Sequence, residues 1–100
     1  MVRVRQTLQL ETAEGIAAQA LAFLAAEPAR LSRFLALTGL RPDDVRGQID
    51  TPELLSAVLD HLAHDESLLL VFAASAQLEP EAVGQALAAL QESKRRPRRA

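Results

Sequence analysis

The sequence predicts an all-α fold, a compact bundle of about six short helices. Its 100 residues are 49% hydrophobic and 24% charged, the balance of an ordinary globular domain. Ala and Leu, both strong helix formers, are abundant, and apolar residues recur with the 3.6-residue period of a helix. Prolines and capping residues divide this pattern into short segments. We therefore expect a helical domain over residues 12–92, between an extended arm over residues 1–11 and a disordered basic tail over residues 93–100.

The first three helices are expected between residues 12 and 49. Thr12 is the predicted N-cap of the first helix, and the apolar residues that follow it fall on one face. Pro28 fits the first turn of a second helix, which ends at Gly39 because glycine readily adopts the left-handed conformation of a helix end. Pro42 opens a short third helix, and two aspartates follow it in the first turn, where negative charge favours the helix dipole.

The same signals then return for three further helices. Thr51 and Pro52 form a cap followed by proline, and an apolar stripe follows them. Asp65 is the predicted cap of a fifth helix that runs through Ala76, and Pro80 opens a sixth. The second half of the chain therefore restarts the pattern of the first half.

An internal repeat with a constant offset of 38 residues relates residues 12–49 to residues 50–87. The most informative matches, which are neither Ala nor Leu, are Phe34 with Phe72, Pro42 with Pro80, and Val45 with Val83. A three-helix unit has an apolar face that it cannot bury alone. The simplest interpretation is that two such units pack against one another, with internal pseudo-symmetry.

The repeat also identifies candidate protein-interaction residues in the fifth helix. Leu68 and Val71 stand where the first half has Arg30 and Arg33, so this helix is apolar nearly all round. Such a helix is either the central helix of the bundle or is covered on its extra face by something else.

The N-terminal arm supplies a second apolar stripe without a partner. Apolar residues alternate there with polar ones, the period of a strand, at Val2, Val4, Leu8 and Leu10. A lone strand cannot satisfy its own backbone, so it should pair or dock. We expect the arm or a second subunit to cover the fifth helix.

The C-terminal tail is the candidate contact to a polyanion. Residues 1–93 carry six Arg against thirteen acids, whereas the tail has five positive charges: Lys94, Arg95, Arg96, Arg98 and Arg99. One interpretation is electrostatic attachment to nucleic acid or anionic lipid. The favoured one is a solvated end that aids solubility, because the acidic body repels the same polyanions.

No motif indicates catalysis, a cofactor or a small-molecule substrate. The chain has no cysteine, no Gly-x-Ser-x-Gly and no glycine-rich phosphate loop. His61 and His64 share a helix face, but two nitrogens are too few for Zn²⁺, so a position near a helix C-terminus is favoured over a metal site. The longest apolar stretch, residues 68–76, is far below the ~20 residues of a spanning helix. We expect a cytoplasmic protein that is not an enzyme.

Three segments resemble a known family: residues 20–24, residues 34–42 with the signature Thr-Gly-Leu-Arg-Pro, and residues 54–59. The family is the domain-of-unknown-function family 3572, and the resemblance covers roughly residues 12–91. It implies a small helical protein of alphaproteobacteria, and it transfers no activity, cofactor or catalytic residue.

The leading functional hypothesis is a protein–protein interaction or adaptor module, which forms a homodimer or binds another protein. The alternative is a small nucleic-acid-associated regulator that uses the basic tail. A salt-dependent interaction with nucleic acid, lost when residues 94–99 are deleted, would favour the alternative.

Overall fold

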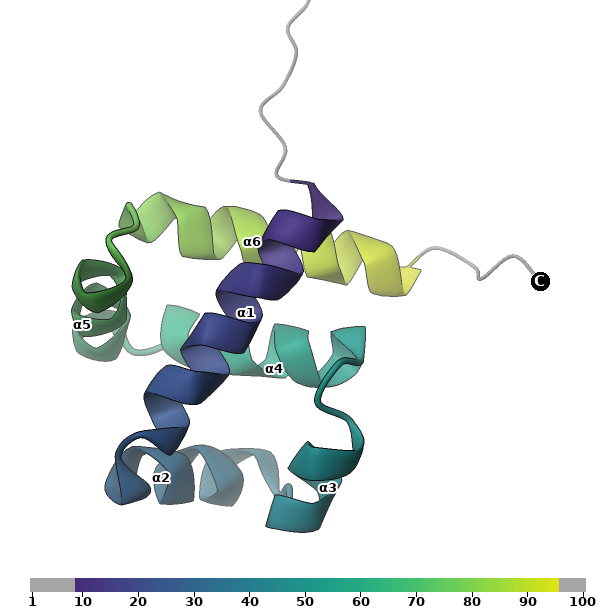
Figure 1. Ribbon diagram of the computed structural model, residues 1–100, viewed down its shortest axis with the longest axis vertical. Helices are drawn as coiled ribbons and strands as arrows, with labels where there is room; N and C mark the ends of the chain where they lie inside the picture. The colour runs from purple at the N-terminus through teal and green to yellow at the C-terminus, as the bar shows by residue number, and fades with distance from the viewer. Residues whose placement is uncertain (1–8, 96–100) are drawn as a thin grey trace, which may run out of the picture.

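A computed structural model describes residues 9–95 of the chain, which form the six helices of Figure 1. Their bounds are α1 Leu10–Ala25, α2 Pro28–Thr38, α3 Pro42–Gly47, α4 Pro52–Ala63, α5 Glu66–Ala76 and α6 Pro80–Arg95. The predicted all-α fold and the number of helices are confirmed for these residues.

Most helices start and end at the residues that the sequence predicts. The Thr51 Oγ1 accepts the backbone N–H of Leu54 at 3.2 Å, and the Asp65 Oδ1 accepts the backbone N–H of Leu68 at 3.2 Å. Both side chains satisfy a donor that the first turn of a helix leaves unpaired. Gly39 ends α2 with a φ of 76°.

The predicted N-cap of α1 is wrong by three residues. The N-cap is Gln9 rather than Thr12, and the carbonyl of Gln9 accepts the N–H of Ala13 at 3.0 Å. Leu10 therefore lies in the first turn of α1 and not in an extended arm. At the other end, α6 continues through Arg95, past the predicted domain end at residue 92, because the next helix breaker is Pro97.

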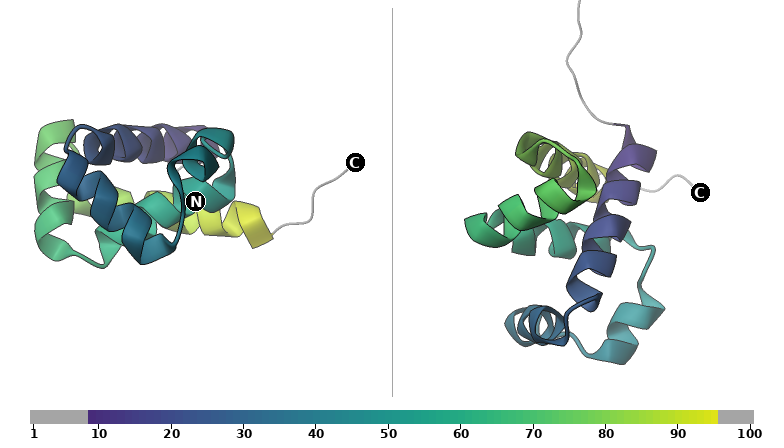
Figure 2. Two further views of the ribbon diagram at one scale, coloured as in Figure 1. Left: turned by 90° about the horizontal axis from the view of Figure 1, so that it is seen from below. Right: turned by 60° about the vertical axis from the view of Figure 1, so that its left-hand side comes forward.

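The core lies between α1, α4 and α6. Each of these three helices contacts the other two, and α1 crosses in front of α4 and α6 (Figure 1). Their inward side chains are fully buried, among them Leu24, Val58, Leu59, Leu62 and Leu90. From the periphery, α2 and α5 insert the buried rings of Phe34 and Phe72. The right-hand view of Figure 2 shows α2 and α3 at the end of the molecule opposite α6.

The structure excludes α5 as the central helix of the bundle. Only Phe72 and Ala73 of this helix are buried, although its sequence is apolar nearly all round. The central position belongs to α1, α4 and α6, whose apolar stripes together close the core. The interpretation that remains is that α5 lies at the edge of the bundle and has a second apolar face, which the core does not cover.

One ring contact recurs, with the roles of the two halves exchanged, between residues 38 apart. The ring of Phe23 packs against Phe72 with 5.4 Å between centroids, and the matching pair, His61 and Phe34, lies at 5.2 Å. A contact of residue i with j, repeated as j with i, is typical of two-fold related units. The third helices differ, since α3 has six residues and α6 has sixteen. A repeat of the whole three-helix unit stays a prediction.

Candidate protein-interaction surfaces

The outer face of α5 exposes large apolar side chains. Leu70 is 47% exposed and Val71 is 48% exposed, while their neighbours Phe72 and Ala73 point into the core. Ala74 lies one turn beyond Leu70 and is also exposed. Residues three and four apart share a helix face, so these three residues form one apolar strip, which we call the α5 face.

Acidic side chains border the α5 face. Glu66 lies one turn before Leu70 on the same side of α5, and Glu79 follows the end of the helix; both are exposed. Between residues 47 and 93 the chain has no Lys or Arg, but it has eight acids: Asp50, Glu53, Asp60, Asp65, Glu66, Glu79, Glu81 and Glu92. This stretch of the chain is therefore acidic, while Arg33 of α2 lines the same cleft as Glu66.

The predicted interaction residues divide into three groups. Val71 is on the α5 face, as its exposure shows, whereas Leu68 is half-buried and packs against the core. Leu10 is 40% exposed and lies in the first turn of α1, so its backbone is helical rather than extended. Val2, Val4 and Leu8 lie outside the described residues.

Sequence analysis missed Leu70, although the repeat contained the signal. Its equivalent 38 residues earlier is the polar Ser32, which is exposed on α2. The change from polar to apolar therefore occurs three times on α5: at the exposed positions Leu70 and Val71, and at the half-buried Leu68.

A second apolar surface is a groove between α1, α2 and α3, with a volume of about 350 Å³. Its walls are aliphatic except for one arginine: Ala18, Leu21, Ala22, Ala25, Leu31, Leu35, Pro42, Val45, Arg46 and Ile49. Ile49 is 54% exposed at the edge. We call this surface the α3 groove; the sequence analysis did not predict it.

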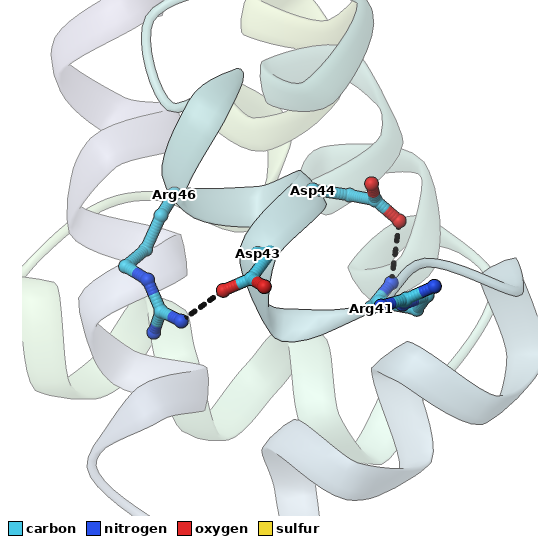
Figure 3. Close-up of polar contacts among 4 residues, drawn as sticks. All are labelled: Arg41, Asp43, Asp44 and Arg46. Atoms are coloured by element: carbon cyan, nitrogen blue, oxygen red, sulfur yellow. Dashed lines mark hydrogen bonds and ion pairs between the residues drawn. The ribbon is translucent and has the colours of Figure 1, made fainter.

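Short-range polar contacts hold the helix that forms one wall of the α3 groove. The backbone N–H of Arg41 donates to the Asp44 Oδ2 at 2.9 Å, which closes the start of α3 (Figure 3). One turn along, Arg46 forms an ion pair with Asp43, and both side chains are more than 70% exposed. Such an exposed ion pair contributes little to stability, so it does not hold the Arg46 side chain in one conformation.

The two histidines line a polar cleft of about 660 Å³ between α2, α4 and α5. The His61 ring meets the edge of Phe34, and its buried Nε2 has no hydrogen-bond partner among the described residues. Burial lowers the pKa of His61; the Asp65 carboxylate opposes this shift, and the Arg33 guanidinium adds to it. The His64 Nδ1 lies 2.9 Å from the carbonyl oxygen of Asp60. Within residues 9–95, no group of three or more His, Cys, Asp or Glu is placed to hold a metal.

The comparison with protein families identifies where the chain belongs. The model of the family described as "Protein of unknown function (DUF3572)" matches residues 10–93, which is most of the chain. The chain is a member of the DUF3572 family. No curated protein and no solved structure matches it. The family assignment confirms the resemblance seen in the sequence, and both the α5 face and the α3 groove lie inside the DUF3572 region. Among the described residues, no helix is long and apolar enough to cross a membrane.

The candidate polyanion contacts lie beyond the DUF3572 match. Lys94 and Arg95 form the last turn of α6, where positive charge favours the helix dipole. The Lys94 Nζ donates to the Oγ of the buried Ser56 at 3.3 Å, and Arg95 pairs with Glu92 at 3.4 Å. Arg96, Arg98 and Arg99 lie outside the described residues. The two cations that the structure places therefore contact the chain itself.

Proposed function

We propose that this DUF3572 member is a non-enzymatic, cytoplasmic protein-interaction module that binds a partner protein through the α5 face. The observation that supports the proposal is the exposure of Leu70 and Val71, side by side on a helix whose inner face is already packed. A small domain gains nothing in its own stability from leaving such groups in water, and contiguous exposed apolar groups mark contact sites. Aliphatic side chains of this size contribute about 1.5–3 kcal/mol each when they are fully buried.

The acids around the α5 face indicate what chemistry the partner has. Glu66 lies one turn before Leu70 on the same side of α5, and no Lys or Arg occurs between residues 47 and 93. A two-fold homodimer through two α5 faces would bring these acids together, and like charges repel across an interface. We therefore infer a partner segment whose apolar side chains are bordered by Lys or Arg.

Affinity purification with two matched variants tests this proposal. The first variant combines Leu70→Asp with Val71→Asp, and the control is Leu37→Asp, which alters an exposed apolar residue of α2 outside the α5 face and the α3 groove. We expect a partner that wild type and control recover equally, and that the double variant recovers at least about tenfold less, equivalent to ~1.4 kcal/mol. Circular dichroism should show the same helicity for all three proteins.

The partner's own sequence and the salt dependence complete the test. The segment that crosslinks to α5 should contain apolar residues next to Lys or Arg, and its binding should weaken as salt screens the charges. Equal recovery by the double variant would contradict the proposal. Light scattering tests for a homodimer. If the wild type is a dimer and the double variant is a monomer, the partner is a second copy of this chain.

A further inference from the structure

We propose that protonation of His61 releases α2 from α4, so that acid opens the polar cleft between α2, α4 and α5. The proposal goes beyond the function proposed above, because it concerns a conformational switch in the fold and not the α5 face. It follows from how α2 is attached, from the surroundings of the His61 ring, and from the charges that line the cleft.

A single buried side chain anchors α2. Phe34 is the only residue of this helix that is fully buried, while Leu31 and Leu35 are half-buried against the core. The Phe34 ring meets the His61 ring of α4 with 5.2 Å between centroids and 75° between the ring planes. The attachment of α2 to α4 therefore depends on a contact in which one of the two rings can take up a proton.

The position of the His61 ring suits its neutral form. Its Nε2 is buried and has no hydrogen-bond partner among residues 9–95. A neutral imidazole can leave one nitrogen unprotonated, but both nitrogens of the charged ring are donors. Leaving a buried donor unpaired costs free energy, and the cost is larger for a charged group. The charged ring is therefore more stable when it turns toward the water and the polar groups of the cleft.

The charges around the polar cleft separate a charged His61 from α2. The titratable residues that line the cleft with His61 are Arg33 of α2, Asp60 and His64 of α4, and Asp65 and Glu66 at the start of α5. The Asp65 carboxylate attracts the charged ring, whereas the Arg33 guanidinium repels it. Arg33 directly precedes Phe34, so the repulsion acts on the part of α2 that carries its anchor.

The direction of the pKa shift agrees with this geometry. The pKa of His61 is lowered, chiefly by burial, so the packed position of the ring disfavours the proton. A ring that faces water has the ordinary value of 6.5 and binds the proton more readily. The open state therefore gains population as pH falls through 6.5, and the gain levels off below the lowered pKa.

The first half of the chain offers a comparison without a titratable ring. Phe23 takes the place of His61 and packs against Phe72 of α5 with 5.4 Å between centroids. Arg30 lies 4.3 Å above the Phe23 ring, where a cation is attracted by the ring face. The ring contact that anchors α5 therefore has no group that acid could charge.

Native-state hydrogen exchange, followed by NMR in urea below the unfolding transition, tests the switch. Opening of α2 alone exposes little surface, so the exchange of its amides should depend weakly on urea. The α6 amides around Ala86 should instead report global unfolding, with a steep urea dependence. After correction for intrinsic exchange rates, the protection of the α2 amides should fall at least about threefold from pH ~7.5 to pH ~5.5.

Two variants identify the group responsible. His61→Phe copies the ring pair of Phe23, so the protection of α2 should be the same at both pH values. Arg33→Gln alters an exposed residue and keeps His61 but removes the repulsion, so the fall should be smaller than in wild type.

Three results would overturn the proposal. In the first, the α2 amides exchange with the urea dependence of α6, because α2 then leaves only in global unfolding. In the second, wild type shows no difference between the two pH values. In the third, either variant shows the same fall as wild type. None of these results bears on the α5 face, which rests on Leu70 and Val71.

Discussion

His61 takes, in the second half of the chain, the position that Phe23 takes in the first. Both rings pack against a phenylalanine of the other half, at similar centroid distances. Phe23 also lies under the guanidinium of Arg30, 4.3 Å from its centroid, an attractive cation–π arrangement. His61 instead sits where burial disfavours its protonated form. The same ring position thus holds an apolar ring in the first half and a titratable ring in the second half.

The lowered pKa of His61 predicts how stability depends on pH. The unfolded chain has the ordinary value of 6.5 and binds the proton more readily than the folded chain. Unfolding is therefore favoured as pH falls through 6.5, and the effect levels off below the folded pKa. We expect the free energy of unfolding in urea to be lower at pH 5.5 than at pH ~7.5. The variant His61→Phe should lose part of this difference.

The sequence predicted the place of the two histidines but not their surroundings. His61 lies in the last turn of α4 and His64 is its C-cap, as the helix pattern indicated. The contact of His61 with Phe34 depends on how α2 packs across α4. The spacing of apolar residues along the sequence does not show how two helices pack. The exposure of Leu70 had a signal in Ser32 that only the repeat reveals.

At the scale of elements, α2 and α5 end in the same backbone conformation with different residues. Gly39 has φ 76°, and Gln77, its equivalent, has φ 59°. Glycine adopts this left-handed region freely, but a side chain with a Cβ is strained there. A Cβ built on Gly39 would meet no atom within 4 Å, so the strain at this position comes from the backbone alone.

Exchanging these two residue types should change stability in opposite directions. Gln77→Gly should raise the free energy of unfolding by up to about 1 kcal/mol, because it removes the left-handed strain, offset partly by the greater freedom of glycine in the unfolded chain. Gly39→Gln should lower it by about 1 kcal/mol. Urea denaturation followed by circular dichroism measures both. A loss of stability in Gln77→Gly would show that the side chain of Gln77 contributes more than its strain.

Element boundaries could be predicted wherever a side chain or a proline defines them. Thr51, Asp65 and Gly39 act directly on the adjacent backbone, and all three predictions are confirmed. The start of α1 could not be predicted, because its N-cap Gln9 makes no side-chain hydrogen bond there. The location of α5 could not be predicted either, since an apolar surface all round is equally compatible with burial and with an interface.

At the scale of the whole molecule, charge is divided along the chain. The first half carries four of the six described cations, and the stretch from residue 47 to residue 93 carries none. The positive residues of the C-terminus begin at Lys94, which contacts Ser56 on α4. The predicted basic tail over residues 93–100 therefore starts inside α6, and its first residues have structural contacts.

Truncation after Ser93 should nonetheless have a small effect on folding. The buried Oγ of Ser56 keeps its hydrogen bond to the carbonyl of Glu53, at 3.2 Å, when Lys94 is removed. We expect the melting temperature to fall by less than about 5 °C, the shift that corresponds to ~1 kcal/mol at this size. Lys94→Met in the full-length chain should give the same result. A larger fall in the truncated protein alone would show that residues 95–100 pack on the body.

The reciprocal ring contacts have a consequence for the loop at residues 48–51. The halves before and after this loop contribute to one shared core, since α1 lies against both α4 and α6. The loop thus acts as a tether that gives each half an effective concentration of the order of millimolar near the other. A chain cleaved there becomes a two-component assembly, whose stability depends on how much of each fragment is present. In the intact chain the loop keeps the two halves in one molecule, so the contact between them does not depend on protein concentration.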